Sequence, residues 1–280
     1  MSHGLQVGFS YTYSHALDEQ SGLGLFYNGN NPLNLRSAYG NSDFDRTHVM
    51  NFTYSYELHN FFPESSWKGK IGDGWALDGI AVFQSGQPYS VIDFSGAVGS
   101  IFYGTSDGIN NPIVPLSSNC TPQSAKTGVS GANGTPALNA ACFALPLLNP
   151  GNLNGAIPSN DPYETNFVSR GQHNIFRQTW QRRADISIVK KTQINDRFML
   201  KYMLDVFNLT NTASFDIPID DITQNLQFND FPIAGTPALP TSCDPSNTGF
   251  YSCPTVGGLG LVNKTIGSPR QIQMSLSLQF

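Results

Sequence analysis

Residues 270–280, RQIQMSLSLQF, decide the fold of this chain. Polar and apolar residues alternate through this stretch without a break, which is the pattern of a β-strand with two different faces. The stretch is also longer than the five or six residues of an average strand in a soluble protein. It therefore predicts a strand with lipid on one face and water on the other. The apolar set is Ile272, Met274, Leu276, Leu278 and Phe280.

The same alternation recurs along the rest of the chain. The expected strands lie near residues 4–15, 46–58, 74–86, 181–192, 197–208 and 268–280. At roughly 3.3 Å per residue and a tilt near 40°, each is long enough to cross the hydrocarbon core of a bilayer. The segment 74–86 is the least regular, because Trp75 and Ile80 fall on opposite parities, and a bulge would explain it.

The connections between these segments alternate between long and short. Short turns are expected at 59–73 and 193–196, and long loops at 16–45, 87–180 and 209–267. Outer-membrane barrels have short periplasmic turns and long extracellular loops in this order. We therefore predict an all-β fold, an antiparallel transmembrane β-barrel segment of about six long strands within a larger barrel, with the three long loops on the outer side.

Composition supports strands and loops and argues against several other classes. Only 12% of the residues are charged, about half the usual share of a soluble domain. A net charge of −5 gives no basic surface for nucleic acid, so we expect no nucleic-acid partner. No run of about 18 apolar residues occurs, which excludes a transmembrane helix on hydropathy grounds.

Four cysteines fall into two close pairs, Cys120 with Cys142 and Cys243 with Cys253. Both pairs lie in stretches rich in Gly, Pro, Asn and Ser, and neither has the spacing of a zinc site. Disulfides form in oxidising compartments outside the cytosol, so we predict one within each pair. Proximity alone supports this connectivity, and free thiols or a metal site are the alternatives.

Paired strands must place their apolar residues on the same face of the sheet, and this requirement restricts how the fourth and fifth segments pair. A three-residue turn near Ile194 would place Ile188 opposite Leu200 and Arg183 opposite Asp205, giving an ion pair on the lumen face. A turn two residues longer would instead place Asp185 opposite Asp205. The residues expected to face the lumen are Gln6, Ser10, Asn51, Ser55, Glu57, Arg183, Asp185, Lys201, Asp205, Gln271, Gln273 and Gln279.

No catalytic motif stands out in the sequence, and we expect neither catalysis nor a cofactor. The acidic groups Asp43 with Asp45, and Asp216 with Asp220 and Asp221, are weak candidates for calcium, and solvated loops explain them more simply. Aromatic residues in the loops would either stack on a ligand or pack the loops together. They are Phe94, Phe102, Tyr103, Tyr163, Phe167, Phe176 and Trp180.

Six segments, spread along the whole chain, carry a family resemblance. They are YTYSHALDEQSG (11–22), GNSDFDRTHVMNFTYSYEL (40–58), GWALDGIAVFQSGQPYSV (74–91), RRADISIVKK (182–191), LDVFNLTNTASFDIP (204–218) and SPRQIQMSLSLQF (268–280). In this order they resemble the C-terminal barrel portion of Oar-like TonB-dependent outer-membrane receptors. The resemblance implies a 22-stranded barrel with an N-terminal plug, substrate capture by the outer loops, and energy delivered by TonB through an N-terminal box.

Neither the plug domain nor the TonB box is recognisable in this sequence, and its first residues enter the strand pattern without the features of a signal peptide. We therefore expect a fragment of a longer receptor. The resemblance implies four partners: outer-membrane lipid, the barrel assembly machinery that reads the final strand and Phe280, the TonB complex through the missing N-terminal region, and an unknown substrate. The alternatives are a secreted soluble β-sandwich or carbohydrate-binding module, and a surface enzyme with its site in residues 87–180.

Overall fold

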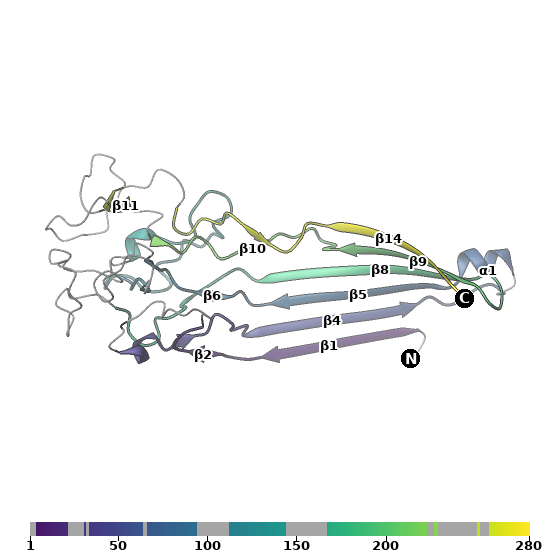
Figure 1. The fold of residues 1–280 in the computed structure, drawn as a ribbon, viewed down its shortest axis with the longest axis horizontal. Helices are drawn as coiled ribbons and strands as arrows, with labels where there is room; N and C mark the ends of the chain where they lie inside the picture. Colours follow the sequence, from purple (N-terminus) through teal and green to yellow (C-terminus); the bar gives the residue numbers. More distant parts are fainter. Residues whose placement is uncertain are drawn as a thin grey trace.

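Six long strands form one antiparallel sheet at one end of an elongated molecule, and the long connections between them extend to the other end (Figure 1). The computed structural model describes residues 4–21, 31, 34–63, 66–93, 112–143, 167–222, 227–228, 251–252 and 258–280. The first and last strands form the two edges of the sheet, which does not close into a barrel.

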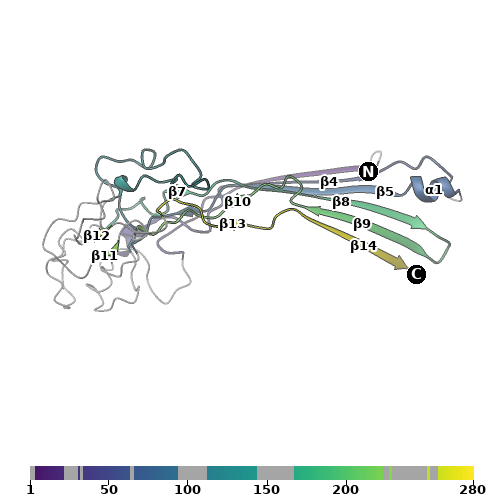
Figure 2. The same cartoon turned by 90° about the horizontal axis from the view of Figure 1, so that it is seen from above.

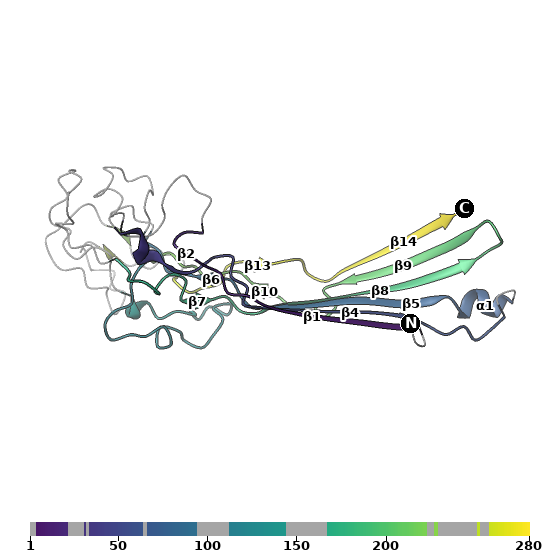
Figure 3. The ribbon, with the colours of Figure 1, turned by 90° about the horizontal axis from the view of Figure 1, so that it is seen from below.

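Each long strand pairs with the next long strand along the chain, so the sheet is a simple up-and-down meander. The strands are β1 (Leu5–Tyr13), β4 (His48–Glu57), β5 (Trp75–Gln84), β8 (Gln181–Gln193), β9 (Met199–Phe207) and β14 (Gln271–Gln279). The predicted antiparallel sheet of six long strands is confirmed. Figures 2 and 3 show that the sheet is curved, because β9 and β14 bend away from the plane of β1 and β4.

The pairing register gathers most of the large apolar residues of the six strands on one face. Phe52 lies between Phe9 and Ala81, and Leu204 lies between Ile188 and Met274. Among the described residues no second sheet packs against this face, and many of its large side chains are exposed, such as Phe9 and Leu276. A soluble β-sandwich would need an opposing sheet to bury them. That alternative therefore does not describe this chain.

Strand β5 is regular, and the bulge that its mixed parity suggested is absent. Its residues pair one to one with β4 on one side and β8 on the other. Leu77 and Phe83 lie on the apolar face, while Ile80 lies on the polar face. Gly79 leaves room on the apolar face for the ring of Tyr54, which a Cβ at residue 79 would overlap.

The predicted ion pair between Arg183 and Asp205 is wrong. The register places Ser187 opposite Asp205, so neither predicted pairing of β8 with β9 occurs. Strand β8 runs to Gln193 and the turn after it is longer than expected, because the side chain of Asn195 accepts hydrogen bonds from the backbone N–H of residues 197 and 198. The even parity of the pairing is retained, so the faces are assigned correctly.

The polar groups involved find other partners. Arg183 bonds Asp185 on its own strand, with 2.9 Å from Nε to each carboxylate oxygen. Asp205 accepts a hydrogen bond from the hydroxyl of Ser187.

In the described residues of the connections, the regular elements are short. They are β2 (Leu17–Asp18), η1 (Leu35–Ala38), β3 (Gly40–Asn41), α1 (Trp67–Gly72), β6 (Pro88–Tyr89), η2 (Ala140–Cys142), β7 (Phe176–Arg177), β10 (Ser214–Phe215), β11 (Gln227–Phe228), β12 (Tyr251–Ser252) and β13 (Thr265–Ile266). In the described part of the chain, no helix has the length and apolarity needed to cross a membrane.

Candidate functional site

The compact hydrophobic core of this molecule lies among the long loops and not in the sheet. We call this region the loop cap; it comprises the described residues of 14–47, 85–180 and 208–270. Its core brings together segments that are far apart in the sequence. The buried members are Tyr89, Val91, Val114, Ala125, Leu138, Cys142, Phe143, Phe176, Ile222 and Leu259. Residues from two different long connections therefore form one folded unit.

A disulfide ties part of this core together. Cys120 and Cys142 are bonded, with 5.4 Å between their Cα atoms, which confirms the predicted pairing of these two residues. Cys142, the last residue of η2, is a buried member of the core. The other predicted pair, Cys243 with Cys253, lies outside the described residues.

Of the aromatic residues predicted to lie in the loops, Phe176 packs in the interior of the loop cap. Phe176 is fully buried and its ring contacts those of Tyr89 and Phe143, with centroids 5.7 and 5.8 Å apart. Trp180 instead lies at the sheet's outer rim, stacked on His48 at 6.0 Å. The candidates Phe94, Phe102, Tyr103 and Tyr163 lie outside the described residues.

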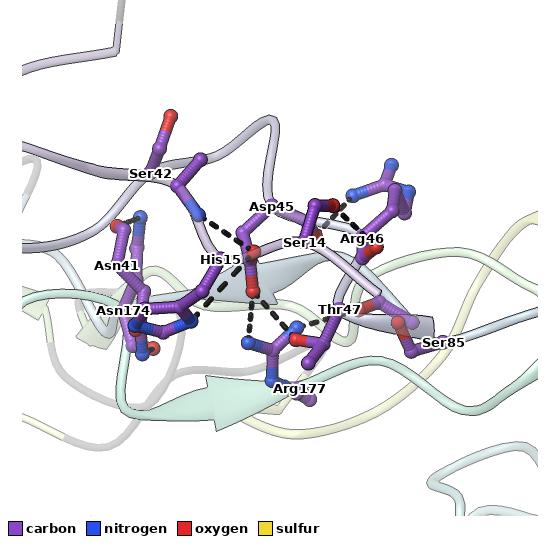
Figure 4. A network of polar contacts seen from close by, with 12 residues as sticks. Ser14, His15, Asn41, Ser42, Asp45, Arg46, Thr47, Ser85, Asn174 and Arg177 are labelled. Carbon is purple, nitrogen blue, oxygen red and sulfur yellow. Dashed lines mark hydrogen bonds and ion pairs between the residues drawn. The ribbon is translucent and has the colours of Figure 1, made fainter. Parts of the chain in front are cut away.

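A buried carboxylate, Asp45, joins the first and second long connections within the loop cap (Figure 4). Arg177 forms an ion pair with it across more than a hundred residues of sequence. The backbone N–H of Ala16 and the hydroxyl of Thr47 donate to the two carboxylate oxygens, at 3.0 and 2.8 Å. His15 Nδ1 stands 3.8 Å from Asp45 Oδ1. Burial acts to raise the pKa of Asp45, but Arg177 and the two hydrogen bonds outweigh it and hold the pKa below its ordinary value.

Asn174 makes a second junction beside the first (Figure 4). Its amide nitrogen donates to the backbone oxygen of Asn41 at 2.8 Å and to Asp43 Oδ1 at 2.6 Å. The amide nitrogen of Asn41 donates in return to the backbone oxygen of Asn174 at 2.9 Å. Asn174 has a φ of 54°, a left-handed conformation that asparagine tolerates better than most residues. The first and second outer loops are thus fastened together by side-chain hydrogen bonds.

The two acidic groups considered for calcium have different environments. Asp43 and Asp45 are engaged by Asn174 and Arg177. Asp216, Asp220 and Asp221 line an open hollow of about 530 Å³ on the surface of the loop cap. Within the described ranges, no three His, Cys, Asp or Glu side chains come together as a metal-ligand set. Burial, and then the neighbouring aspartates, raises the pKa of Asp220 to about 6.

The last strand, β14, carries its apolar residues at an open edge of the sheet. Ile272, Met274, Leu276 and Leu278 all lie on the apolar face, opposite Val206, Leu204, Tyr202 and Leu200 of β9. Phe280 follows the strand and is almost completely exposed. The placement of this set on one face agrees with the alternation of the sequence.

Sequence reasoning missed both junctions between the loops. Asp45 and Arg177 have no sequence pattern that links them, and Asn174 differs in no way from the other asparagines of these loops. The pairing of Pro88 with Arg177 and of Tyr89 with Phe176, in the short β6–β7 ladder, holds Arg177 near the sheet's outer end.

Comparison with known proteins supplies a family. Residues 1–273 match the family model described as outer membrane beta barrel domain. No curated protein and no solved structure matches the chain.

Proposed function

The chain belongs to the outer membrane β-barrel domain family and resides in the bacterial outer membrane, and we propose that within this family it is the C-terminal barrel part of an Oar-like TonB-dependent receptor. In this proposal the loop cap captures a substrate at the cell surface and the chain catalyses no reaction. The apolar face of the sheet meets lipid, and the polar face lines the lumen of the barrel.

The loop cap is the observation that carries the proposal. Outer loops that only joined strands would not need a core of their own, because connecting segments normally run over a protein surface. Here residues from the second and third long connections bury Phe143, Phe176 and Ile222 together. A folded structure at the outer end of a barrel presents a fixed surface for recognition, and it also covers the way into the lumen.

The open edges of the sheet support the second part of the proposal. In lipid, every backbone N–H and C=O must be paired, so a membrane-spanning sheet has to close on itself. Here β1 and β14 are both edge strands, and barrels of a single chain need at least about eight strands. We infer that further strands of the receptor complete a barrel, as the resemblance to 22-stranded receptors implies, and that plug and TonB box belong to the same missing part.

The proposal is tested with the full-length protein in its own outer membrane. We expect TonB to be cross-linked to the tagged receptor and recovered with it, and to be lost from a matched variant that lacks only the TonB box. Failure to recover TonB with the intact protein, or the absence of any plug domain from it, would contradict the proposal.

The role of the loop cap needs a separate variant. Deleting residues 112–143 removes the disulfide and much of the core, whereas the six strands remain. We expect this variant to insert into the membrane and to bind TonB, but to lose TonB-dependent uptake. Retained uptake would show that substrate capture does not depend on the cap.

A further inference from the structure

The connection between β4 and β5, residues 58–74, lies at the end of the sheet opposite the loop cap (Figure 1). It exposes large apolar side chains. Phe61 is 75% exposed, Trp67 70% and Ile71 65%. Outer-membrane barrels have their short turns on the periplasmic side, so this connection lies there. A turn that simply reversed the chain would have no need of such side chains in water.

Helix α1 within this connection stands on the lipid side of the sheet. The indole Nε1 of Trp75 donates to the backbone oxygen of Ile71 at 3.1 Å, and the hydroxyl of Thr192 donates to that of Lys70 at 3.2 Å. Lys190 donates to the backbone oxygen of Asp73. Trp75, Lys190 and Thr192 all share the parity of the apolar face, because they stand in register with Tyr202 and Leu200 or their neighbours. The helix therefore continues the face that meets lipid.

The connection is held firmly in this position. The two carboxylate oxygens of Asp73 accept hydrogen bonds from the backbone N–H of Phe61 and Phe62, at 2.9 Å each. Ser66 caps the start of α1 by accepting from the N–H of Gly69, and Lys70 Nζ donates to the backbone oxygen of residue 194 in the neighbouring turn at 3.2 Å. The exposed apolar side chains are thus fixed on an ordered structure.

The charge of the helix is positive. Lys68 and Lys70 are its charged residues, and the ammonium of Lys68 lies 5.9 Å from the centre of the Trp67 ring. Aromatic rings and lysines together are typical of segments at the membrane–water interface, where the ring lies at headgroup level and the ammonium meets phosphate.

We propose that the connection between β4 and β5 is an interfacial anchor. Phe61, Trp67 and Ile71 enter the boundary between headgroups and acyl chains of the periplasmic leaflet, and Lys68 binds the phosphates of anionic phospholipids. The anchor fixes the height of the barrel in the membrane. This proposal rests on the membership of the chain in the outer membrane β-barrel family, and not on the proposed TonB-dependent function.

The first test measures the depth of residue 67 in lipid. The full-length protein with Trp67→Cys carries an environment-sensitive fluorophore and is inserted into vesicles of phosphatidylethanolamine and phosphatidylglycerol. We expect lipids brominated near the headgroup to quench the label about twofold more strongly than lipids brominated near the chain ends. Matched labels at Leu204→Cys and Lys126→Cys report the lipid face and water. Emission at residue 67 that equals the emission at residue 126 would overturn the proposal.

The second test examines the charge. Replacing phosphatidylglycerol with phosphatidylcholine should reduce the headgroup-level quenching, and Lys68→Gln should remove that dependence while leaving the barrel folded, as judged by heat-modifiable gel mobility. Quenching that is the same in both lipids would contradict the assignment to anionic headgroups.

If Trp67→Cys fails to insert, Ile71→Cys provides a second labelling position. A label that is exposed to water in vesicles but shielded from water in native membranes would show that a protein partner covers this surface. That result would overturn the lipid anchor.

Discussion

The sheet and the loop cap solve the same problem, the burial of apolar side chains, in opposite ways. In the sheet, Met274 is 68% exposed on the apolar face, whereas Phe143 in the loop cap is 2% exposed. The bilayer surrounds the sheet and serves as its core, so no second layer of protein is needed. The cap faces water and must supply its own core, with a disulfide to support it.

The two regions also differ in how they satisfy backbone and side-chain polar groups. Neighbouring strands pair nearly all the backbone groups of the sheet interior, as a structure in lipid requires. The described residues of the cap have few regular strand pairs. Side chains such as Asn174 and Asp45 form hydrogen bonds with its backbone groups instead. The sheet therefore follows a repeating pattern, while the cap depends on individual residues.

The largest effect is expected from emptying the core of the cap. Phe143→Ala should cost about 3–5 kcal/mol of the cap's stability, because the cavity it leaves has no lipid to fill it. Phe44→Ala, at a position 69% exposed in the cap, is the matched control and should cost little. Pulse proteolysis of the loops in urea measures the cap, and heat-modifiable gel mobility measures the sheet. Loss of sheet stability together with cap stability would show that the two regions do not fold independently.

Removal of the disulfide should have a somewhat smaller effect, confined to the cap. Replacing Cys120 and Cys142 together by serine should cost about 3 kcal/mol, the value typical of a closed loop of roughly this length. The same proteolysis assay measures the loss, and reduction of the wild-type protein should reproduce it. An unchanged cap after both treatments would show that the packing around Phe143 suffices without the bond.

A charge placed on the lipid face tests the other half of the comparison. Leu204→Arg should cost about 2–4 kcal/mol if the residue lies near the middle of the bilayer, and less toward its surfaces. Met203→Arg is the matched control, because residue 203 points to the polar face and the arginine there meets lumen water. Urea titration of the folded barrel in lipid vesicles measures both. Equal losses in the two variants would contradict the assignment of the faces.

Alternation made the sheet predictable from the sequence. In a strand with lipid on one side, the polarity of the side chains alternates with a period of two residues. The position of β14 and the face on which its apolar residues lie could therefore be predicted without knowledge of the neighbouring strands. The register of β8 against β9 was beyond that reasoning, because a shift by two residues preserves both faces. The longer turn that accompanies this register is organised by the side chain of Asn195, which accepts hydrogen bonds from two backbone N–H groups.

The cap was much less predictable, and for a physical reason. Its contacts join residues that are far apart, such as Asp45 with Arg177, and no periodicity connects them. The close spacing of Cys120 and Cys142 was the exception, since loop closure favours near neighbours. The position of α1 on the lipid side was also hidden, because it depends on the contacts of Trp75 and Thr192 with its backbone.

The smallest expected effect is a dependence of cap stability on pH. Burial and neighbouring aspartates raise the pKa of Asp220 to about 6, so its protonated form favours the folded cap, and stability should increase as the pH falls through 6. Asp45 acts in the opposite sense. Its pKa lies below the ordinary value of 3.8, so the stability from its ion pair with Arg177 is present above that value and is lost as the pH falls below it.

The cap should therefore be most stable slightly above the ordinary aspartate pKa, and the two halves of the profile can be separated by mutation. A fluorophore on Lys126→Cys reports unfolding of the cap in urea across the pH range. Asp220→Asn should flatten the decline in stability as the pH rises from its ordinary pKa of 3.8 to about 6, and leave the acid limb in place, because Asp45 still carries that limb. Asp45→Asn should weaken the cap near neutral pH and flatten the acid limb. An upper limb that persists unchanged in Asp220→Asn would show that another group of the cap titrates there.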